Sequence, residues 1–395
     1  MPRIRSRFLP AWAPTAVAAL IILVLDPAHA LSADRGSLYG SPEPGSRAYA
    51  AAGAPAAFAI VAVDSMSGEW GVAAVSRWIA VGARSLDARA GAGALAALEL
   101  PDQRGHALAL DHLAHGLPAR ATLDSLLSMD ARREERQLAL VDRAGAIAAH
   151  TGALCPRWAG ERMGKGYACQ GVGLRDGEVL AAMGRTFAAT AGSLAERLLA
   201  ALETGESIFP LRGPGESAAI LVVRAGGGPG GRSDRMVDLR VDQAIDALQS
   251  LKSVYAVHAA TFLPAAYARF GDEAGRQGDT ISAEREYARA ESAFRAAVAR
   301  SPKDPDALNE LAWFLATHGR GSEEAVRYAK AAIAARPRDP NLYDTLAEAE
   351  YRSGSLSQAI ESMDHAVKYS GGAPRYTNRL ALWTRERAAL EGKAR

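Results

Sequence analysis

Five polar residues that could support acid–base or nucleophilic chemistry stand at the ends of predicted strands. They are Asp64, Ser76, Arg136, His150 and Ser217. Ser76, or alternatively Ser85, could act as a nucleophile with His150 as its base, if the two lie within hydrogen-bond reach. Each also has an ordinary explanation, since Asp64 beside two serines is typical of a turn and a strand-end histidine often only donates or accepts a hydrogen bond.

Other chemistries lack their sequence signatures. We find no GxSxG elbow, HExxH helix or phosphate-binding loop, and expect neither metal nor cofactor. The glycine-rich residues 224–234 lie between two predicted strands and are typical of a hairpin tip. Cys155 and Cys169 are the two cysteines of the chain. In an oxidising compartment they could close a disulfide loop worth roughly 3 kcal/mol, and two free buried thiols are the alternative.

Residues 1–30 have the pattern of a signal peptide. A basic "MPRIRSRF" precedes the apolar "TAVAALIILVL", and "AHA" offers a cleavage site. An uncleaved anchor is the alternative. We expect a periplasmic or extracellular protein with no membrane span after cleavage. The formal net charge is +2, and losing the leader brings it near zero, which argues against a nucleic-acid partner.

The residues after the leader divide into a linker and a region of mixed structure. Residues 31–55 are rich in Pro, Gly, Ser and Ala and predict a flexible linker. Residues 56–242 alternate apolar strands, in adjacent pairs, with blocks of helices, which favours an α+β fold with antiparallel sheets. Predicted strands are 57–63, 70–76, 88–98, 136–142, 145–150, 167–173, 217–224 and 236–241; predicted helices are 104–115, 119–128, 176–189 and 191–204.

The last third of the chain is predicted to be helical and contains a repeat. Residues 243–280 are predicted as connecting helices and 281–395 as repeats. Pro305 matches Pro340 at an offset of 35 residues, and small apolar residues recur at matching positions. This pattern resembles the tetratricopeptide repeat (TPR). Such stacks present a concave face, which predicts a protein or peptide partner; dimerisation or shielding of the first domain is the alternative. Candidate face residues are Asn309, Trp313, Tyr343 and Asp344.

Six segments in order carry a second resemblance, covering about residues 56–242. They are "FAIVAVDSMSGEWGVAAVSRWIAVGA", "RAGAGALA", "REERQLALVDRAGAIAAHTGALCPRWAG", "LAERLLAALETGE", "SAAILVVR" and "DLRVD". Together they resemble a bacterial family of unknown function in the N-terminal nucleophile (Ntn) hydrolase superfamily. The resemblance implies an αββα sandwich. It also implies amide hydrolysis by a first-residue Thr, Ser or Cys whose own amine is the base.

The resemblance also predicts that this chemistry has been lost. The nucleophile position, directly before the first-strand Phe, is Ala57. Ala97-Leu98 replaces Thr-Gln, Val172 replaces Asn after Gln170-Gly171, and Ile208–Pro210 replaces Gly-Gly-Asp, while the five strand-end candidates and Gln137 are retained. We therefore expect a non-catalytic Ntn-like domain joined to a TPR-type binding module. The alternatives are a hydrolase with another nucleophile and a small-ligand binder in a cleft near Ala57, Ala97, Leu98 and Val172.

Overall fold

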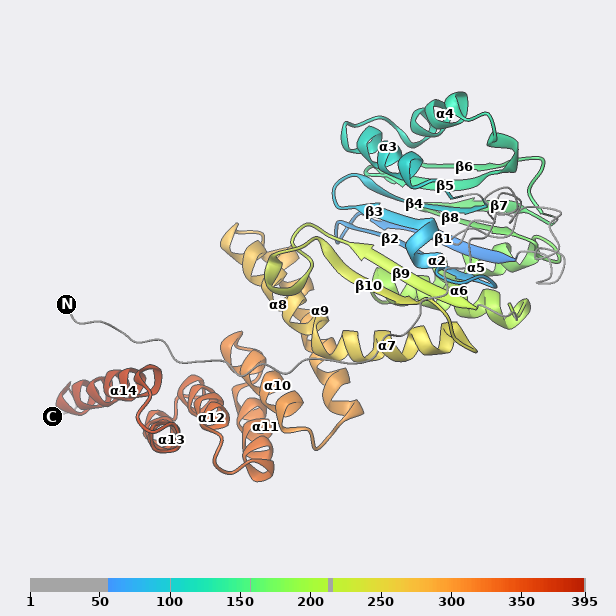
Figure 1. The fold of residues 1–395 in the computed structure, drawn as a ribbon. Helices are drawn as coiled ribbons and strands as arrows, with labels where there is room; N and C mark the ends of the chain where they lie inside the picture. The colour runs from blue at the N-terminus through green and yellow to red at the C-terminus, as the bar shows by residue number, and fades with distance from the viewer. Residues whose placement is uncertain (1–55, 100, 157, 212–215, 394–395) are drawn as a thin grey trace, which may run out of the picture.

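The computed structural model describes residues 56–99, 101–156, 158–211 and 216–393. The predicted signal peptide and linker lie outside these residues. The described chain forms a layered α+β sandwich followed by a row of helices that extends from one end of it (Figure 1). None of the described helices is long and apolar enough to cross a membrane.

A six-stranded antiparallel sheet forms the centre of the sandwich. In spatial order its strands are β10 (Arg235–Val241), β9 (Ser217–Val223), β2 (Glu69–Ser76), β1 (Ala57–Asp64), β8 (Tyr167–Val172) and β7 (Gly160–Gly164). Strand β1 is internal, between β2 and β8. Its side chains alternate, so that Phe58 and Ile60 face a helical layer whereas Ala59 and Val61 face the second sheet.

The second sheet has four strands and contains a bulge. Its order is β3 (Leu86–Arg89), β4 (Gly93–Glu99), β5 (Gln137–Asp142) and β6 (Ile147–Thr151). Ala97 pairs with Leu138 and Glu99 pairs with Gln137, so Leu98 is an extra residue on β4. Such a bulge lets two successive side chains point to the same layer. Leu98 and Glu99 accordingly line one cavity, whereas Ala97 faces the opposite side of the sheet.

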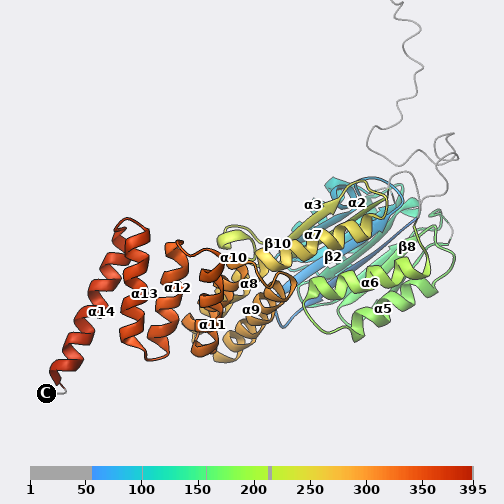
Figure 2. The same cartoon turned by 90° about the horizontal axis from the view of Figure 1, so that it is seen from below.

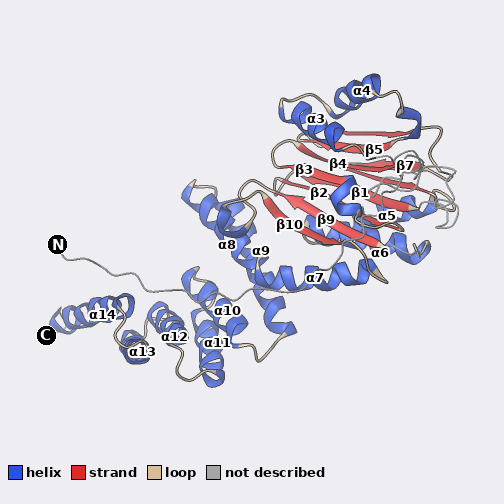
Figure 3. Ribbon diagram, viewed as in Figure 1, coloured by secondary structure: helices blue, strands red, loops and turns tan. Residues whose placement is uncertain are grey.

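Helices cover both outer faces of the paired sheets (Figure 3). Helices α5 (Glu178–Ala189) and α6 (Leu194–Ile208) pack on the six-stranded sheet. Helices α3 (Gln103–Ala114) and α4 (Ala119–Met129) pack on the four-stranded sheet. The short α2 (Val81–Ser85), η1 (Arg133–Glu135) and η2 (Pro229–Gly231) lie in connections. This order of layers confirms the predicted αββα sandwich followed by a helical stack.

Local sequence accounts for the elements that begin and end the sandwich. The β1–β2 turn is closed by Asp64, whose Oδ1 accepts from the backbone N–H of Met66 at 3.0 Å, and by Gly68 with φ of 67°. Helix α6 begins with a capping box, in which Ser193 and Glu196 satisfy each other's backbone N–H groups.

The helical stack is built of three pairs and a final helix (Figure 2). Its elements are α8 (Leu263–Arg276) with α9 (Thr280–Arg300), α10 (Pro305–Thr317) with α11 (Ser322–Ala335), α12 (Pro340–Arg352) with α13 (Leu356–Tyr369), and α14 (Pro374–Lys393). Asp304 and Asp339 cap α10 and α12, each before a first-turn proline, which explains the repeated Asp-Pro.

Residues 243–280 contain two helices with different roles. Helix α7 (Ala247–Thr261) packs Leu248 and Leu251 into the core beside the six-stranded sheet. Helix α8 instead pairs with α9, as the later helices pair. The two helices are separated at Phe262, because Pro264 can occupy only the first turn of a helix. Two differences from the predicted elements are that 88–98 forms β3 and β4 joined by a turn, and that the short β7 was not predicted.

Sandwich and stack share one core and a buried ionic cluster. We call Glu69, Arg224, Glu286 and Arg289 the junction cluster. Arg289 lies 2.7 Å from Glu69 and 3.3 Å from Glu286, and Arg224 lies 3.1 Å from Glu286. Both carboxylate side chains are almost completely buried. Because Glu69 belongs to β2 and Glu286 to α9, these charges fix the stack against the sandwich.

Candidate functional site

Ala57 lies inside the sandwich and not at an open chain end. Its side chain is 5% exposed and faces the layer between the two sheets. The carbonyl of the preceding residue, Ala56, accepts from Arg77 N at 3.0 Å, so the sheet pairing extends upstream of Ala57. Ala57 supplies neither a hydroxyl nor a free amine at this position. The two groups on which N-terminal nucleophile chemistry depends are therefore both missing here.

The space beside Ala57 is too small for a substrate. The cavity measures about 20 Å³ and is lined by residues that include Ala57, Ser76, Leu98, Glu99 and Val172. A single water needs roughly 10–15 Å³. The expected small-ligand cleft at this position is therefore wrong in this structure. Ala97, which was expected to line it, instead faces helices α3 and α4 because of the bulge in β4.

Ser76 and Ser217 come together but serve the backbone. They are paired across β2 and β9. Ser76 Oγ accepts from Trp78 N at 3.1 Å. Ser217 Oγ accepts from Val81 N at 3.1 Å and donates to the carbonyl of Trp78. These bonds hold the turn from β2 to α2, where Ala80 adopts a left-handed φ of 59° that costs roughly 1–2 kcal/mol.

The other three candidates lie elsewhere and do not join the serines. Asp64 closes the turn at the opposite end of β1 from Ala57. Arg136 forms an ion pair with Asp130. His150 Nε2 bonds the carbonyl of Arg133 at 2.8 Å. His150 pairs with Leu138 on the helix-covered face of its sheet, whereas Ser76 faces the intersheet layer. Ser85 lines the cavity beside Ala57, also away from that helix-covered face. The suggested Ser76–His150 and Ser85–His150 pairs are therefore wrong.

The predicted disulfide is also wrong. Both cysteines lie in the described part of the chain, and both are free thiols. Cys155 packs in the layer between the sheets, whereas Cys169 on β8 packs toward α5 and α6. The six-stranded sheet therefore separates them. Burial raises the pKa of Cys155 to about 11 and that of Cys169 to about 12, so neither is a thiolate nucleophile at neutral pH.

Sequence reasoning missed Glu99, a buried titratable group beside the predicted nucleophile position. It is 7% exposed and lines the same small cavity as Ala57 and Ser85. Burial raises its pKa to about 7, while the charge of Arg84 opposes that rise. The bulge that turns Glu99 inward has no clear mark in the sequence, because the surrounding run of alanines and leucines fits several registers. A pKa near neutrality suits a general base, but this cavity has no room for a substrate.

Two buried glutamines connect the sheets next to this cavity. Gln170 on β8 donates to the carbonyl of Ala96 at 2.8 Å. Gln137 on β5 donates to the carbonyls of Gly171 at 2.9 Å and Gly160 at 3.1 Å. A buried amide that bridges two backbones specifies their spacing. Gln137 and Gln170 therefore fix the spacing of the two sheets.

The stack presents a second candidate site. A cavity of about 660 Å³, which we call the stack pocket, is lined by Asp272, Tyr287, Trp313, Thr317, His318, Gly319 and Arg352. Trp313 is 38% exposed. Of the other expected face residues, Asp344 pairs with Arg379 at 2.8 Å, Asn309 is half-buried, and Tyr343 packs on His365 and Tyr369 of α13. Trp313 is the predicted face residue that lines the stack pocket.

Comparison with known proteins assigns the sandwich to a family. A family model described as a family of unknown function (DUF1028) matches residues 57–251. Protein SPO2555 from Silicibacter pomeroyi, of the same family, is 30% identical over 53% of this chain and 90% of that chain, with a TM-score of 0.48. The chain therefore belongs to this family of unknown function. No curated protein matches the chain.

Solved TPR structures are similar to part of this chain at low scores. The Sgt2 TPR domain from Aspergillus fumigatus is 20% identical over 32% of this chain and 83% of that one, with a TM-score of 0.27. The first TPR of Spaghetti (RPAP3), solved with an HSP90 peptide, is 15% identical over 32% of this chain and 94% of that one, with a TM-score of 0.26. The chain's own helix pairs and sequence offset carry the TPR-like description.

Proposed function

We propose that this protein is an exported binding protein. Its sandwich keeps the layers of an Ntn hydrolase without the N-terminal nucleophile reaction, and its stack binds an extended protein segment. The observation that carries the first half is the environment of Ala57, which is buried inside a paired strand beside a cavity of about 20 Å³. The leader-like residues 1–30 support export to the periplasm or beyond, and no basic surplus favours nucleic acid.

Replacement nucleophiles fit the structure poorly. Ser65 and Ser67 lie in the turn after β1, so cleavage before either residue would remove an internal strand of the six-stranded sheet. Cleavage before Ser76 would remove most of β2 as well. Ser76 already accepts a backbone hydrogen bond. An active hydrolase that uses one of these serines would therefore need a different fold at its centre.

The stack pocket supports the second half of the proposal. An exposed tryptophan in a hollow is the kind of side chain that dominates binding energy at protein interfaces. Trp313 is framed by Asp272 and Arg352, which supply one charge of each sign. Asp272 accepts from Tyr287 at 3.0 Å and lies 3.2 Å from His318 Nε2, so the hollow is already ordered before a partner arrives. The RPAP3 structure named above holds a peptide, and we propose a comparable role here.

Peptide binding to a Trp313→Ala variant tests this role. Peptides selected from a displayed random library against the full chain are measured by fluorescence anisotropy. We expect the variant to lose at least about tenfold in affinity, because the apolar anchor is removed. Leu382→Ala is the matched control, since Leu382 is an exposed apolar residue of α14 outside the stack pocket. Equal affinity of the wild-type and Trp313→Ala chains for the selected peptides would refute binding through this pocket.

A further inference from the structure

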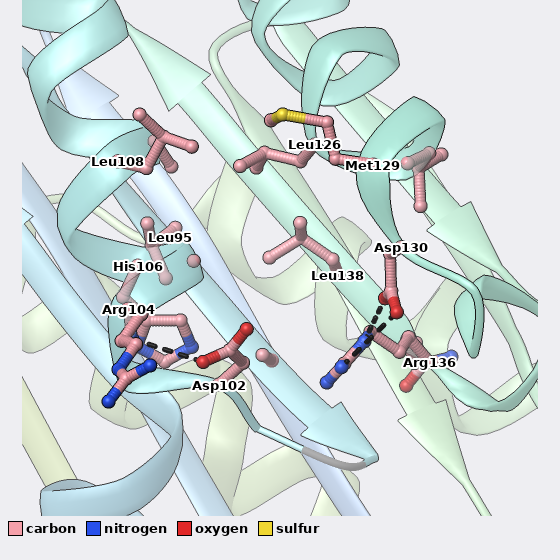
Figure 4. A pocket seen from close by; sticks show the side chains of 15 residues that line it. Leu95, Asp102, Arg104, His106, Leu108, Leu126, Met129, Asp130, Arg136 and Leu138 are labelled. Atoms are coloured by element: carbon pink, nitrogen blue, oxygen red, sulfur yellow. Dashed lines mark hydrogen bonds and ion pairs between the residues drawn. The ribbon is translucent and has the colours of Figure 1, made fainter.

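A second cavity lies on the opposite side of the four-stranded sheet from Ala57. It measures about 310 Å³ and lies between that sheet and helices α3 and α4. We call it the α3–α4 pocket. Figure 4 shows polar side chains at one end and apolar side chains at the other. The apolar end is formed by Leu95, Leu108, Leu126, Met129 and Leu138. An amphipathic cavity of this kind matches a ligand with one polar end and one apolar end.

His106 is a buried polar group that the fold leaves unsatisfied. It lines the α3–α4 pocket and is 3% exposed. Neither Nδ1 nor Nε2 has a hydrogen-bond partner among the described residues. Burial lowers the pKa of His106, so the ring is neutral at neutral pH. The nearby carboxylates of Asp87 and Asp102 oppose this lowering of the pKa, and the charge of Arg136 adds to it. A neutral imidazole retains one N–H donor, and buried donors of this kind are normally satisfied.

The polar end carries two carboxylates, Asp102 and Asp130, and two guanidinium groups, Arg104 and Arg136. Arg136 is paired with Asp130. Asp102 caps α3 by accepting from Arg104 N at 3.1 Å, and its charge is favourable at a helix N-terminus. Arg104 is exposed beside the opening, and its guanidinium forms no ion pair within the described part of the chain. Arg104 is therefore the guanidinium at the polar end that a bound anion can face.

We propose that the α3–α4 pocket binds a small monocarboxylate with an apolar body. The body lies among the leucines and Met129, and the carboxylate accepts from His106 and faces Arg104. The volume is near the lower limit of ordinary ligand pockets, roughly 300 Å³, and therefore excludes a folded partner or a long lipid. A phosphate or nucleotide does not fit, because the lining is mainly apolar and its two guanidinium groups are accompanied by two carboxylates. This site is independent of Ala57 and of the stack pocket.

Calorimetric titration of the full chain with octanoate tests the proposal. 1-Octanol keeps the apolar body without the charge, and acetate keeps the charge without the body. We expect saturable binding of octanoate, at least about tenfold weaker binding of octanol, and no binding of acetate. Arg104→Gln should weaken octanoate binding at least about fivefold while leaving octanol unchanged, because only the carboxylate faces Arg104. Arg120→Gln, an exposed arginine of α4 outside the pocket, is the matched control.

Three further variants keep the test decisive. Leu108→Trp fills the apolar end and should abolish binding of both octanoate and octanol. His106→Gln retains a donor and should bind more tightly than His106→Phe, which retains none. Circular dichroism identifies any variant that fails to fold, and the exposed position of Arg104 makes Arg104→Gln the least disruptive of the set. The proposal is overturned if octanoate does not bind, or if Arg104→Gln and Leu108→Trp, both folded, bind it as the wild type does.

Discussion

At the scale of a residue, Glu99 is a buried carboxyl group beside the first residue of β1. A carboxyl group with a pKa near 7 lies where a reacting centre is expected, yet it adjoins Ala57 and a cavity of about 20 Å³. Ser76 and Ser217 are bonded to the backbone of the neighbouring turn. Ser76 and Ser217 therefore stabilise the backbone of this turn. Glu99 affects the stability of the fold in a way that depends on pH.

Replacing Glu99 by Gln tests this role through pH dependence. The pKa of Glu99 is raised in the folded protein, so its contribution to stability is fully present below its ordinary pKa and is lost as pH rises through about 7. Gln carries no charge at any pH. We therefore expect the free energy of unfolding of Glu99→Gln, relative to that of the wild type, to rise by about 3 kcal/mol when the pH is raised from about 4 to about 8. Urea unfolding at both pH values measures this gain.

The control for Glu99 is an exposed glutamate. Glu361 on α13 is exposed, so Glu361→Gln should follow the wild-type pH dependence. A wild-type chain and a Glu99→Gln variant that lose stability in parallel as pH rises would show that Glu99 is not buried as the structure places it.

At the scale of elements, the sequence predicts the strands, turns and helix starts that depend on neighbouring residues in the chain. The hairpins β1–β2 and β5–β6 were predicted because apolar runs flank turns such as Asp64–Gly68. The α10 and α12 starts follow from Asp-Pro. The separation of β3 from β4, by contrast, depends on a turn at Gly91 with φ of 72°, inside a uniform Gly/Ala run without a clear period.

Site residues were harder to predict because their grouping depends on packing between distant elements. The five strand-end candidates share a position in their strands but not a layer of the sandwich. His150 and Ser76 face different layers because strand register decides which side a residue takes. The register shift at Leu98 likewise decides that Glu99, and not Ala97, approaches Ala57. A single sequence does not determine the strand register or the position of a bulge, so it does not predict which of these side chains meet.

The junction cluster yields a prediction for the contact between β2 and α9. Arg289→Met removes the partner 2.7 Å from the buried Glu69. Arg224, 3.8 Å from Glu69, then remains as its more distant partner. Breaking a buried ion pair costs about 3–5 kcal/mol, so we expect the free energy of unfolding to fall by about 3 kcal/mol, the lower end of that range. Chemical denaturation monitored by circular dichroism measures the change.

An exposed ion pair is the control for the junction cluster. Arg185 and Glu178 on α5 are both more than half exposed, so Arg185→Gln should change stability by less than about 1 kcal/mol. If Arg289→Met were no more destabilising than Arg185→Gln, the cluster would not be the buried contact between sandwich and stack that we describe.

At the scale of the whole molecule, the sandwich and the stack are one continuous structure. Leu251 of α7, Tyr267 of α8 and Phe294 of α9 belong to the same apolar core as Phe58 of β1. A segment bound in the stack pocket is therefore held at a fixed position relative to the sandwich and its α3–α4 pocket. We propose that this arrangement lets one exported chain hold a protein segment and a small ligand together.

The N-terminus of the mature protein tests the central claim most directly. The full chain is expressed with its own leader, and intact-mass and peptide mass spectrometry identify the first residue. Our account predicts a start at Leu31, or an uncleaved leader, and a peptide that runs through Ala56–Ala57 without a break. A mature chain that begins at Ser65, Ser67 or Ser76 would contradict it, because a hydroxyl nucleophile with a free amine would then exist.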